Sequence, residues 1–310
     1  MKIYHGVDVF KNVPNPVLTT GTFDGVHLGH RALIERINSI AIANKGESVM
    51  LTFYPHPRMV LHPDDHGLKL LNTQEEKAEQ LERAGLQHLV IQPFTPEFSR
   101  RSALEYTRGL LVDGIQPHTV VVGYDHRFGR NREGDFQQLA EFGEMFDFQV
   151  EEITAQTVEE VKVSSTKIRK ALSNGDVATA NHYLGYNYPL NGIVIEGDGI
   201  GSKMGYPTAN LQLTSSLKLL PLNGVYAIKA EVESKNYNGM LNIGVRPTVT
   251  SIGDLRVEAN LFELEENLYG KSIRIELIQR IRSEQKFNSV EELKLQLAHD
   301  RELALNCLAK

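Results

Sequence analysis

The sequence predicts an α/β protein with two domains: a Rossmann-like parallel sheet with helices on both faces, then a small β-barrel with a closing helix. The first observation is that strand and helix patterns alternate up to about residue 184. The second is that short strands with glycine turns follow this point. The length of 310 residues also suits two domains, which we expect to span 1–184 and 185–310.

The stretch 17–37 has the pattern of a strand, a glycine loop and a helix. An apolar, β-branched run comes first, and from Leu28 onward the apolar residues fall roughly on one helical face. His27 and His30 flank the start of this helix, where unpaired N–H groups and the positive end of the dipole favour a phosphate. Taken alone, the two histidines could also be a metal pair or two solvated side chains.

The elements that follow continue the alternation. Thr73 and Glu76 form a capping-box pattern at the start of a helix. Because helices connect successive strands, the sheet should be mostly parallel. We expect further strands at 48–53, 88–91 and 119–123, and helices at 73–84, about 96–111, 164–172 and 177–184.

Two segments that follow strands are candidate ligand sites, because open α/β sheets bind ligands at this edge. In 54–58, two prolines around a histidine fix a rigid, extended turn, which without a ligand is only a stiff loop. In 123–135, glycines and arginines surround Phe128. Arginine suits phosphates and an aromatic side chain suits a flat ring system, although a solvated polar loop has a similar composition.

A second helix start brings together Ser164, Ser165 and Thr166, with Arg169 one turn further along. The hydroxyl groups can cap the helix. Together with the N–H groups and the arginine, they suit a triphosphate or a leaving pyrophosphate. An ordinary capped helix would explain the same residues on capping grounds alone.

The second half has the pattern of a barrel. Ser289 and Glu292 form a capping-box pattern at the start of the last helix, expected at 289–308. The strand patterns lie at 193–195, 225–228, 240–243, 256–261 and 273–277.

The glycine-rich stretch 196–210 matches neither the dinucleotide fingerprint nor a P-loop. Thr208 and Asn210 offer neutral oxygen atoms on the same side of an extended segment, and Mg²⁺ prefers oxygen ligands beside substrate phosphates. A plain turn is the alternative. Glu258 lies in a predicted strand, where a glutamate is either an exposed face residue or a general base.

The first domain resembles the nucleotidyltransferase superfamily, whose His-x-Gly-His signature is matched by residues 27–30. The longer string 21–30 is similar to the FMN adenylyltransferase half of bacterial bifunctional riboflavin kinase/FAD synthetases. Two further family motifs match at 123–129 and 164–169, with His126 where many members have Phe. The resemblance implies catalytic roles for His27, His30 and Arg169, phosphate or ATP binding by Gly21, Phe23, Asp24, Gly29, Ser164, Ser165 and Thr166, and flavin binding by Pro55, His56, Pro57, Asp125, Arg127 and Phe128, with Arg58 beside them.

The second domain resembles riboflavin kinases through Gly-x-Pro-Thr-Ala-Asn at 205–210 and further motifs at 223–226, 242–248, 268–270 and 282–287. Ala259 and Asn260 follow Glu258 where many members have a β-branched residue and His. The resemblance implies that Thr208 and Asn210 hold Mg²⁺ and ATP, that Glu258 is the catalytic base, that Gly199, Gly201, Lys203 and Gly205 bind phosphate, and that Arg282 and Phe287 bind flavin.

The resemblance covers nearly the whole chain and implies a bifunctional enzyme. The second domain would convert riboflavin and ATP to FMN and ADP, and the first would convert FMN and a second ATP to FAD and diphosphate. In the second reaction the FMN phosphate attacks the α-phosphorus, so catalysis needs positioning and charge stabilisation rather than a protein nucleophile. Two alternatives remain: a nucleotidyltransferase for another phosphorylated acceptor, and a non-catalytic flavin-binding protein.

The composition excludes several other classes. A net charge of −6 offers no attraction for nucleic acid or an acidic membrane surface. The start of the chain lacks a signal-peptide core, and no apolar run approaches the ~18 residues of a membrane span, so we expect a cytoplasmic protein. Cys307, the single cysteine, cannot form an intrachain disulfide. We expect a monomer or a weak homo-oligomer.

Overall fold

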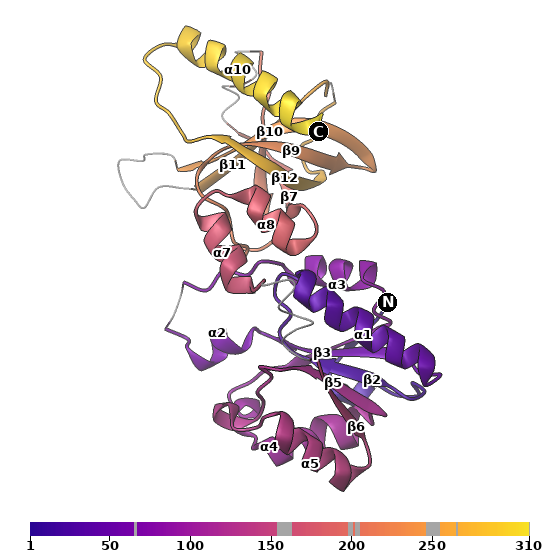
Figure 1. Cartoon of the computed structure of the whole chain (residues 1–310). Helices are drawn as coiled ribbons and strands as arrows, with labels where there is room; N and C mark the ends of the chain where they lie inside the picture. The colour runs from indigo at the N-terminus through magenta and orange to yellow at the C-terminus, as the bar shows by residue number, and fades with distance from the viewer. Residues whose placement is uncertain are drawn as a thin grey trace. The chain divides into compact units, whose positions relative to one another are not determined.

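The computed structural model describes residues 1–64, 67–153, 163–197, 201, 205–245, 255–264 and 266–309. The chain forms two compact units, Met1–Ser164 and Ser165–Lys310 (Figure 1). This division precedes two short helices that the expected boundary near residue 184 assigns to the first domain. Because a compact unit and a catalytic domain need not end at the same residue, that boundary stays a prediction.

The first unit is built on a six-stranded parallel sheet in the order β1-β4-β3-β2-β5-β6. All four residues of β2 are buried, as expected for a strand covered on both faces. The strand order reverses at β2, which lies between β3 and β5, and open sheets bind ligands at such a point. The strands are β1 (Lys2–His5), β2 (Val17–Thr20), β3 (Ser48–Tyr54), β4 (His88–Pro93), β5 (Thr119–Gly123) and β6 (Gln149–Ile153).

Helices cover both faces of this sheet, as predicted (Figure 1). Ile34 and Ile37 of α1 (Leu28–Ala43) and Leu81 of α3 (Gln74–Arg83) pack on one face. On the other face, buried side chains come from α4 (Ala103–Tyr106), the π-helical segment Thr107–Ile115 and α5 (Phe136–Phe146). The predicted capping box of α3 is present, with Thr73 Oγ1 and the Glu76 carboxylate each accepting the other residue's N–H group.

The prediction of one helix over 96–111 was wrong at its start. A 3₁₀ turn at Phe98–Arg100 comes first, and a new helix begins after Ser102, whose hydroxyl group accepts the N–H of Glu105 at 3.3 Å. The expected extended turn at 54–58 also differs, because Pro57 opens the short helix α2 (Pro57–Leu61). Helix α5 and strand β6 were not predicted from the sequence.

The second unit begins with α7 (Ser165–Ser173) and α8 (Val177–Leu184), which ends at Gly185 in the left-handed region, with φ of 75°. Six antiparallel strands then form the predicted closed barrel in the order β10-β11-β8-β7-β12-β9. Strand β8 was not predicted from the sequence. The strands are β7 (Tyr188–Ile195), β8 (Ala209–Leu213), β9 (Gly224–Val232), β10 (Lys235–Val245), β11 (Leu255–Leu261) and β12 (Ser272–Arg282).

The last helix, α10 (Val290–Leu308), packs against β9, β10 and β12. The Ser289 hydroxyl group accepts the N–H of Glu292 at 3.1 Å, as predicted. The return bond differs from a capping box, because the Glu292 carboxylate accepts the N–H of Asn288 instead. In the described part of the chain, no helix is both long enough and apolar enough to cross a bilayer.

Two candidate active sites

The loop between β2 and α1 has a strained backbone. Phe23 and Val26 have φ angles of 46° and 33°, a region that costs free energy for a side chain with a Cβ atom and most of all for a β-branched one. Buried contacts hold the loop in this shape. The Asp24 carboxylate accepts the N–H of Leu71 at 3.0 Å and that of Asn72 at 3.2 Å. Asp24 is therefore placed as a loop anchor, and its predicted role in ATP binding stays a prediction.

His27 and His30 form a stacked pair at the start of α1. Their ring centroids lie 3.6 Å apart with an interplanar angle of 14°, and His27 Nδ1 accepts the N–H of His30 at 3.4 Å. Burial lowers the pKa of His27 to about 4. Burial, with the neighbouring charges of His27 and Lys77, also lowers the pKa of His30 well below its ordinary value. Both rings are therefore neutral at pH 7, and His27 carries its proton on Nε2, where it can be donated to a ligand.

A cavity of about 630 Å³ opens beside this pair, between the loops that follow β2 and β5. Gly21, Phe23 and His30 line it from the first loop, and Asp125, Arg127 and Phe128 from the second, so the topology brings these predicted residues together. One wall is aromatic, and five arginines lie around it. Arg130 and Arg132 belong to the arginine-rich stretch 123–135 predicted as a candidate site. The other lining residues were not identified from the sequence: the rings of Phe53, Phe94, Phe98 and Tyr106, and the side chains of Arg100 and Arg101.

His126, the departure from the family motif, behaves as a flat neutral ring. It stacks on Phe128 with a centroid distance of 5.7 Å and an angle of 18°. Burial lowers the pKa of His126 to about 4, so it is uncharged at pH 7. A neutral imidazole stacked on a phenyl ring can take the place of the phenylalanine that many members have.

The Pro-His-Pro segment divides between two surfaces. Pro57 lines the large cavity. His56 faces a smaller pocket together with Asp24 and Lys77, and its Nδ1 accepts the N–H of Arg58 at 3.2 Å as the cap of α2. The flavin contacts predicted for this segment stay predictions.

The Ser-Ser-Thr-x-Ile-Arg motif lies where the first unit ends and the second begins along the chain. Ser164 ends the first unit, whereas Ser165, Thr166 and Arg169 lie in the first turns of α7 in the second. That these residues act with the histidine pair stays a prediction.

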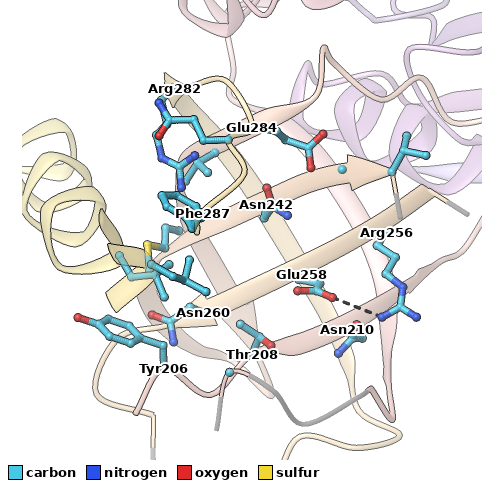
Figure 2. Close-up of a pocket in the computed structure, with 18 residues that line it drawn as sticks. Tyr206, Thr208, Asn210, Asn242, Arg256, Glu258, Asn260, Arg282, Glu284 and Phe287 are labelled. Atoms are coloured by element: carbon cyan, nitrogen blue, oxygen red, sulfur yellow. Dashed lines mark ion pairs between the residues drawn. The ribbon is translucent and has the colours of Figure 1, made fainter. Parts of the chain in front are cut away.

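The second candidate site lies on the face of the barrel strands that also packs against α10, and it is built across three strands. Glu258 of β11 pairs directly with Asn210 of β8 on one side and with Asn242 of β10 on the other. Residues paired in this way share a face of the sheet, and all three line a cavity of about 430 Å³ (Figure 2). Arg256, two residues before Glu258, also faces the cavity, and its Nη1 atom lies 3.8 Å from Glu258 Oε1.

The Pro-Thr-Ala-Asn segment lines the same cavity. Thr208 and Asn210 both contribute to its wall near Glu258 (Figure 2), and their binding of Mg²⁺ and ATP stays a prediction. Gly201 lies there too, and a Cβ atom on it would approach the carbonyl oxygen of Tyr206 to 2.3 Å, so only glycine fits. Gly205 has a φ of 84° and does not line the cavity. The predicted phosphate contacts Gly199 and Lys203 lie outside the described residues.

The donor set of this cavity fits a magnesium ion bound together with ATP. Thr208 and Asn210 supply a hydroxyl and an amide oxygen atom, the hard ligands that Mg²⁺ prefers. The described residues contain no cluster of three or more His, Cys, Asp or Glu side chains that could hold a metal alone. A magnesium ion here would thus depend on substrate phosphates for part of its coordination.

Arg282 and Phe287 form another part of the cavity wall. The Arg282 guanidinium makes a two-point contact with the buried Asp300 of α10, with Nε–Oδ1 at 2.9 Å and Nη2–Oδ2 at 2.8 Å. Its Cζ lies 5.8 Å from the centroid of the Phe287 ring. Arg282 therefore ties β12 to α10 beside the cavity, and its flavin contact stays a prediction. Tyr206 and Glu284, which also line the cavity, lie within the motifs 205–210 and 282–287, whereas Arg256 was not identified as a site residue from the sequence.

Comparisons with known proteins also divide the chain into two parts, each matching a different family. A family model described as "FAD synthetase" matches residues 10–167, and one described as "Riboflavin kinase" matches residues 184–308. The chain is 38% identical over 293 residues to the bifunctional riboflavin kinase/FMN adenylyltransferase of Bacillus subtilis strain 168, covering 93% of this chain and 91% of that one. It is 34% identical over 303 residues to the protein of the same name from Escherichia coli K12, covering 97% and 96%.

A solved structure is similar over almost its full length. This structure, named "Crystal Structure of Macrolide-efflux Protein from Streptococcus pneumoniae", is 29% identical in sequence and covers 99% of each chain with a TM-score of 0.89. The parallel sheet followed by a closed barrel is therefore an architecture that is also found in a crystal structure.

Proposed function

The chain belongs to the family of bifunctional riboflavin kinase/FMN adenylyltransferases, and from that membership we propose how its residues make FAD in two steps. The riboflavin kinase converts riboflavin and ATP to FMN and ADP. The FMN adenylyltransferase converts FMN and a second ATP to FAD and diphosphate. The order of the two family models along the chain assigns the kinase to the barrel and the adenylyltransferase to the parallel sheet.

For the kinase, Glu258 is the general base. Its carboxylate takes the proton of the terminal ribityl hydroxyl group while that oxygen bonds to the γ-phosphorus and ADP leaves. Arg256, 3.8 Å away, holds the carboxylate in place. Thr208 and Asn210 would hold Mg²⁺ with the ATP phosphates, and the ion would neutralise their charge. The pairing of Asn210 with Glu258 across β8 and β11 is the single observation that carries this proposal.

For the adenylyltransferase, the FMN phosphate attacks the α-phosphorus of ATP and diphosphate leaves. The phosphate is already ionised at pH 7, so no general base is needed. The neutral rings of His27 and His30, with the N–H groups at the start of α1, donate hydrogen bonds to the charge that develops on the phosphate oxygens. Ser165 and Arg169 act on the departing diphosphate.

The flavin ring of FMN binds against the aromatic wall of the 630 Å³ cavity. Phe128 with the stacked His126 lies at one end of this wall, and Phe53, Phe94 and Phe98 continue it. Arginines on the same cavity suit the phosphates of FMN and ATP. We propose on the same grounds that Asp125 and Arg127 contact the flavin.

The adenylyltransferase domain extends to about residue 184 in this proposal. Support comes from the FAD synthetase model, which continues to residue 167, past the end of the first compact unit at Ser164. A cytoplasmic location, a monomer or weak homo-oligomer, and no nucleic-acid partner complete the proposal. The net charge of −6 supports the last point.

Incubating the purified protein with riboflavin, ATP and Mg²⁺, followed by chromatography of the flavins, tests the two activities. We expect FMN first and FAD later. FMN alone would contradict the proposal for the first domain, and FAD from supplied FMN without any FMN from riboflavin would contradict the proposal for the barrel. Omitting Mg²⁺ and adding a chelator should stop FMN formation, and continued turnover would remove the metal from the mechanism.

A further inference from the structure

Lys77 is a buried lysine that no motif identified. It lies on α3, is 6% exposed, and its Nζ donates a hydrogen bond of 2.8 Å to the carbonyl oxygen of Thr22. Lysine is almost never buried unless it is paired. Thr22 belongs to the strained loop between β2 and α1 that precedes the histidine pair, and Thr52 Oγ1 of β3 donates to the same carbonyl oxygen at 3.4 Å.

The loop between β2 and α1 is held by α3, and by the residues just before it, through contacts of both Asp24 and Lys77. Asp24 binds the N–H groups of Leu71 and Asn72 just before α3, and Lys77 binds the loop backbone from the first turn of α3. These contacts act where Phe23 and Val26 hold unfavourable φ angles, which persist only when surrounding contacts determine them. Loss of either contact would let the loop relax and shift His27.

The ammonium group of Lys77 also sets the electrostatics behind the site. The titratable groups around it in the described structure include Asp24 of the loop, His30 of α1, Tyr54 at the end of β3 and His56 after it. Burial lowers the pKa of Lys77 to about 8, against the opposing effect of Asp24, so the group is still mostly charged at pH 7. Its charge is one cause of the lowered pKa of His30.

We propose that Lys77 is a positioning residue for adenylyl transfer: its ammonium group fixes the Thr22 carbonyl, and thereby the loop that aims His27 and His30 at the reacting phosphate. The inference rests on the proposed adenylyltransferase site. Lys77 itself does not touch the reacting atoms. It therefore acts through the position of the loop that carries His27 and leads to His30.

Lys77→Met tests the inference because it keeps the length of the side chain and removes the charge and the donor. With FMN and ATP supplied, we expect kcat for FAD formation to fall by about 10²-fold, as for an active-site displacement of about 1 Å, with a smaller change in KM for FMN. FMN formation from riboflavin by the same chain should be unchanged, and a urea unfolding curve like that of the unmodified chain should show that the first unit is folded. Lys11→Met, at an exposed lysine of the same unit, is the matched control and should keep both activities.

A pH profile of the unmodified chain is the second test. As Lys77 loses its proton above about pH 8, FAD formation should fall relative to FMN formation measured in the same sample between about pH 7 and 9.5. Equal rates for Lys77→Met and the unmodified chain, or a ratio of activities that stays constant over this range, would overturn the inference. If the unmodified chain makes no FAD from FMN, the proposed function fails as well, which distinguishes the two failures.

Discussion

Asn260 Nδ2 donates a hydrogen bond of 2.7 Å to the carbonyl oxygen of Pro207. Asn260 is the residue that departs from the family pattern two positions after Glu258, and Pro207 begins the Pro-Thr-Ala-Asn segment. The bond therefore joins the strand that carries the proposed base to the segment that carries the proposed magnesium ligands. We propose on this ground that Asn260 helps to position Thr208.

Asn260→Leu should weaken the kinase selectively. The substitution keeps the side-chain volume but leaves the Pro207 carbonyl oxygen without this donor, at a cost of about 1–3 kcal/mol. We expect the displaced Pro207–Asn210 segment to lower FMN formation by about tenfold, which corresponds to about 1.4 kcal/mol in the activation free energy. FAD formation from supplied FMN serves as the control. Asn260→His restores a ring donor and should recover most of the rate; equal loss in both variants would argue against the hydrogen bond as the cause.

Glu258→Gln should abolish most of the kinase activity. The amide has nearly the shape of the carboxylate but cannot accept the ribityl proton, and general-base catalysis contributes about 10²–10⁴-fold. The rate of FMN formation is the measurement, with FAD formation from FMN expected to be unchanged. Glu266→Gln, at an exposed glutamate paired with Lys235, is the matched control. Full FMN formation by Glu258→Gln would rule out Glu258 as the base.

His30→Ala should impair FAD formation and leave FMN formation unaffected. Removing one preorganised donor from a phosphate site costs about 10²–10³-fold in kcat, and the stacking of His30 on His27 and the contact with Phe23 at 4.8 Å are lost as well. We expect FAD formation to fall by that factor while FMN formation persists. Normal FAD synthesis in a folded variant would remove His30 from the mechanism.

The first unit should lose stability on acidification, with His27 as one cause. In the unfolded chain this histidine takes up a proton near pH 6.5, whereas in the folded chain its pKa is about 4. The unfolded state therefore binds more protons between these values, so the contribution is complete above about pH 6.5 and is lost as the pH falls toward 4. Its size is about 3 kcal/mol at the acid end. Urea unfolding at several pH values measures the slope, and His27→Asn should reduce it; an equal slope would contradict the assignment.

Local signals in the sequence predicted most of the fold. The apolar run of β2, the Thr73–Glu76 capping box and the glycine after α8 each depend on neighbouring residues only, and the structure confirms all three. The missed helix α5 had a local signal too, because Asp135 caps it by accepting the N–H of Gln138. The glycine- and arginine-rich loop just before it concealed that signal.

Only those site residues that belong to a sequence motif could be predicted. The aromatic wall of the first cavity is formed by Phe53, Phe94, Phe98 and Tyr106, which lie in separate segments of the chain. These rings come together only because of the order of strands in the sheet. Lys77 lies in a highly charged helix, so its sequence neighbours suggest an exposed side chain. Its burial is a property of the packing of α3 on the loop after β2.

His126→Phe should leave FAD synthesis intact. The imidazole of His126 is neutral and stacks on Phe128 at 5.7 Å, so a phenyl ring can occupy the same space and keep the stacking. Steady-state rates with supplied FMN should agree with those of the unmodified chain within about twofold, well below the tenfold that 1.4 kcal/mol represents. His126→Ala removes the ring and should raise KM for FMN. A large loss in His126→Phe would mean that an imidazole nitrogen, rather than the flat ring, contributes to the site.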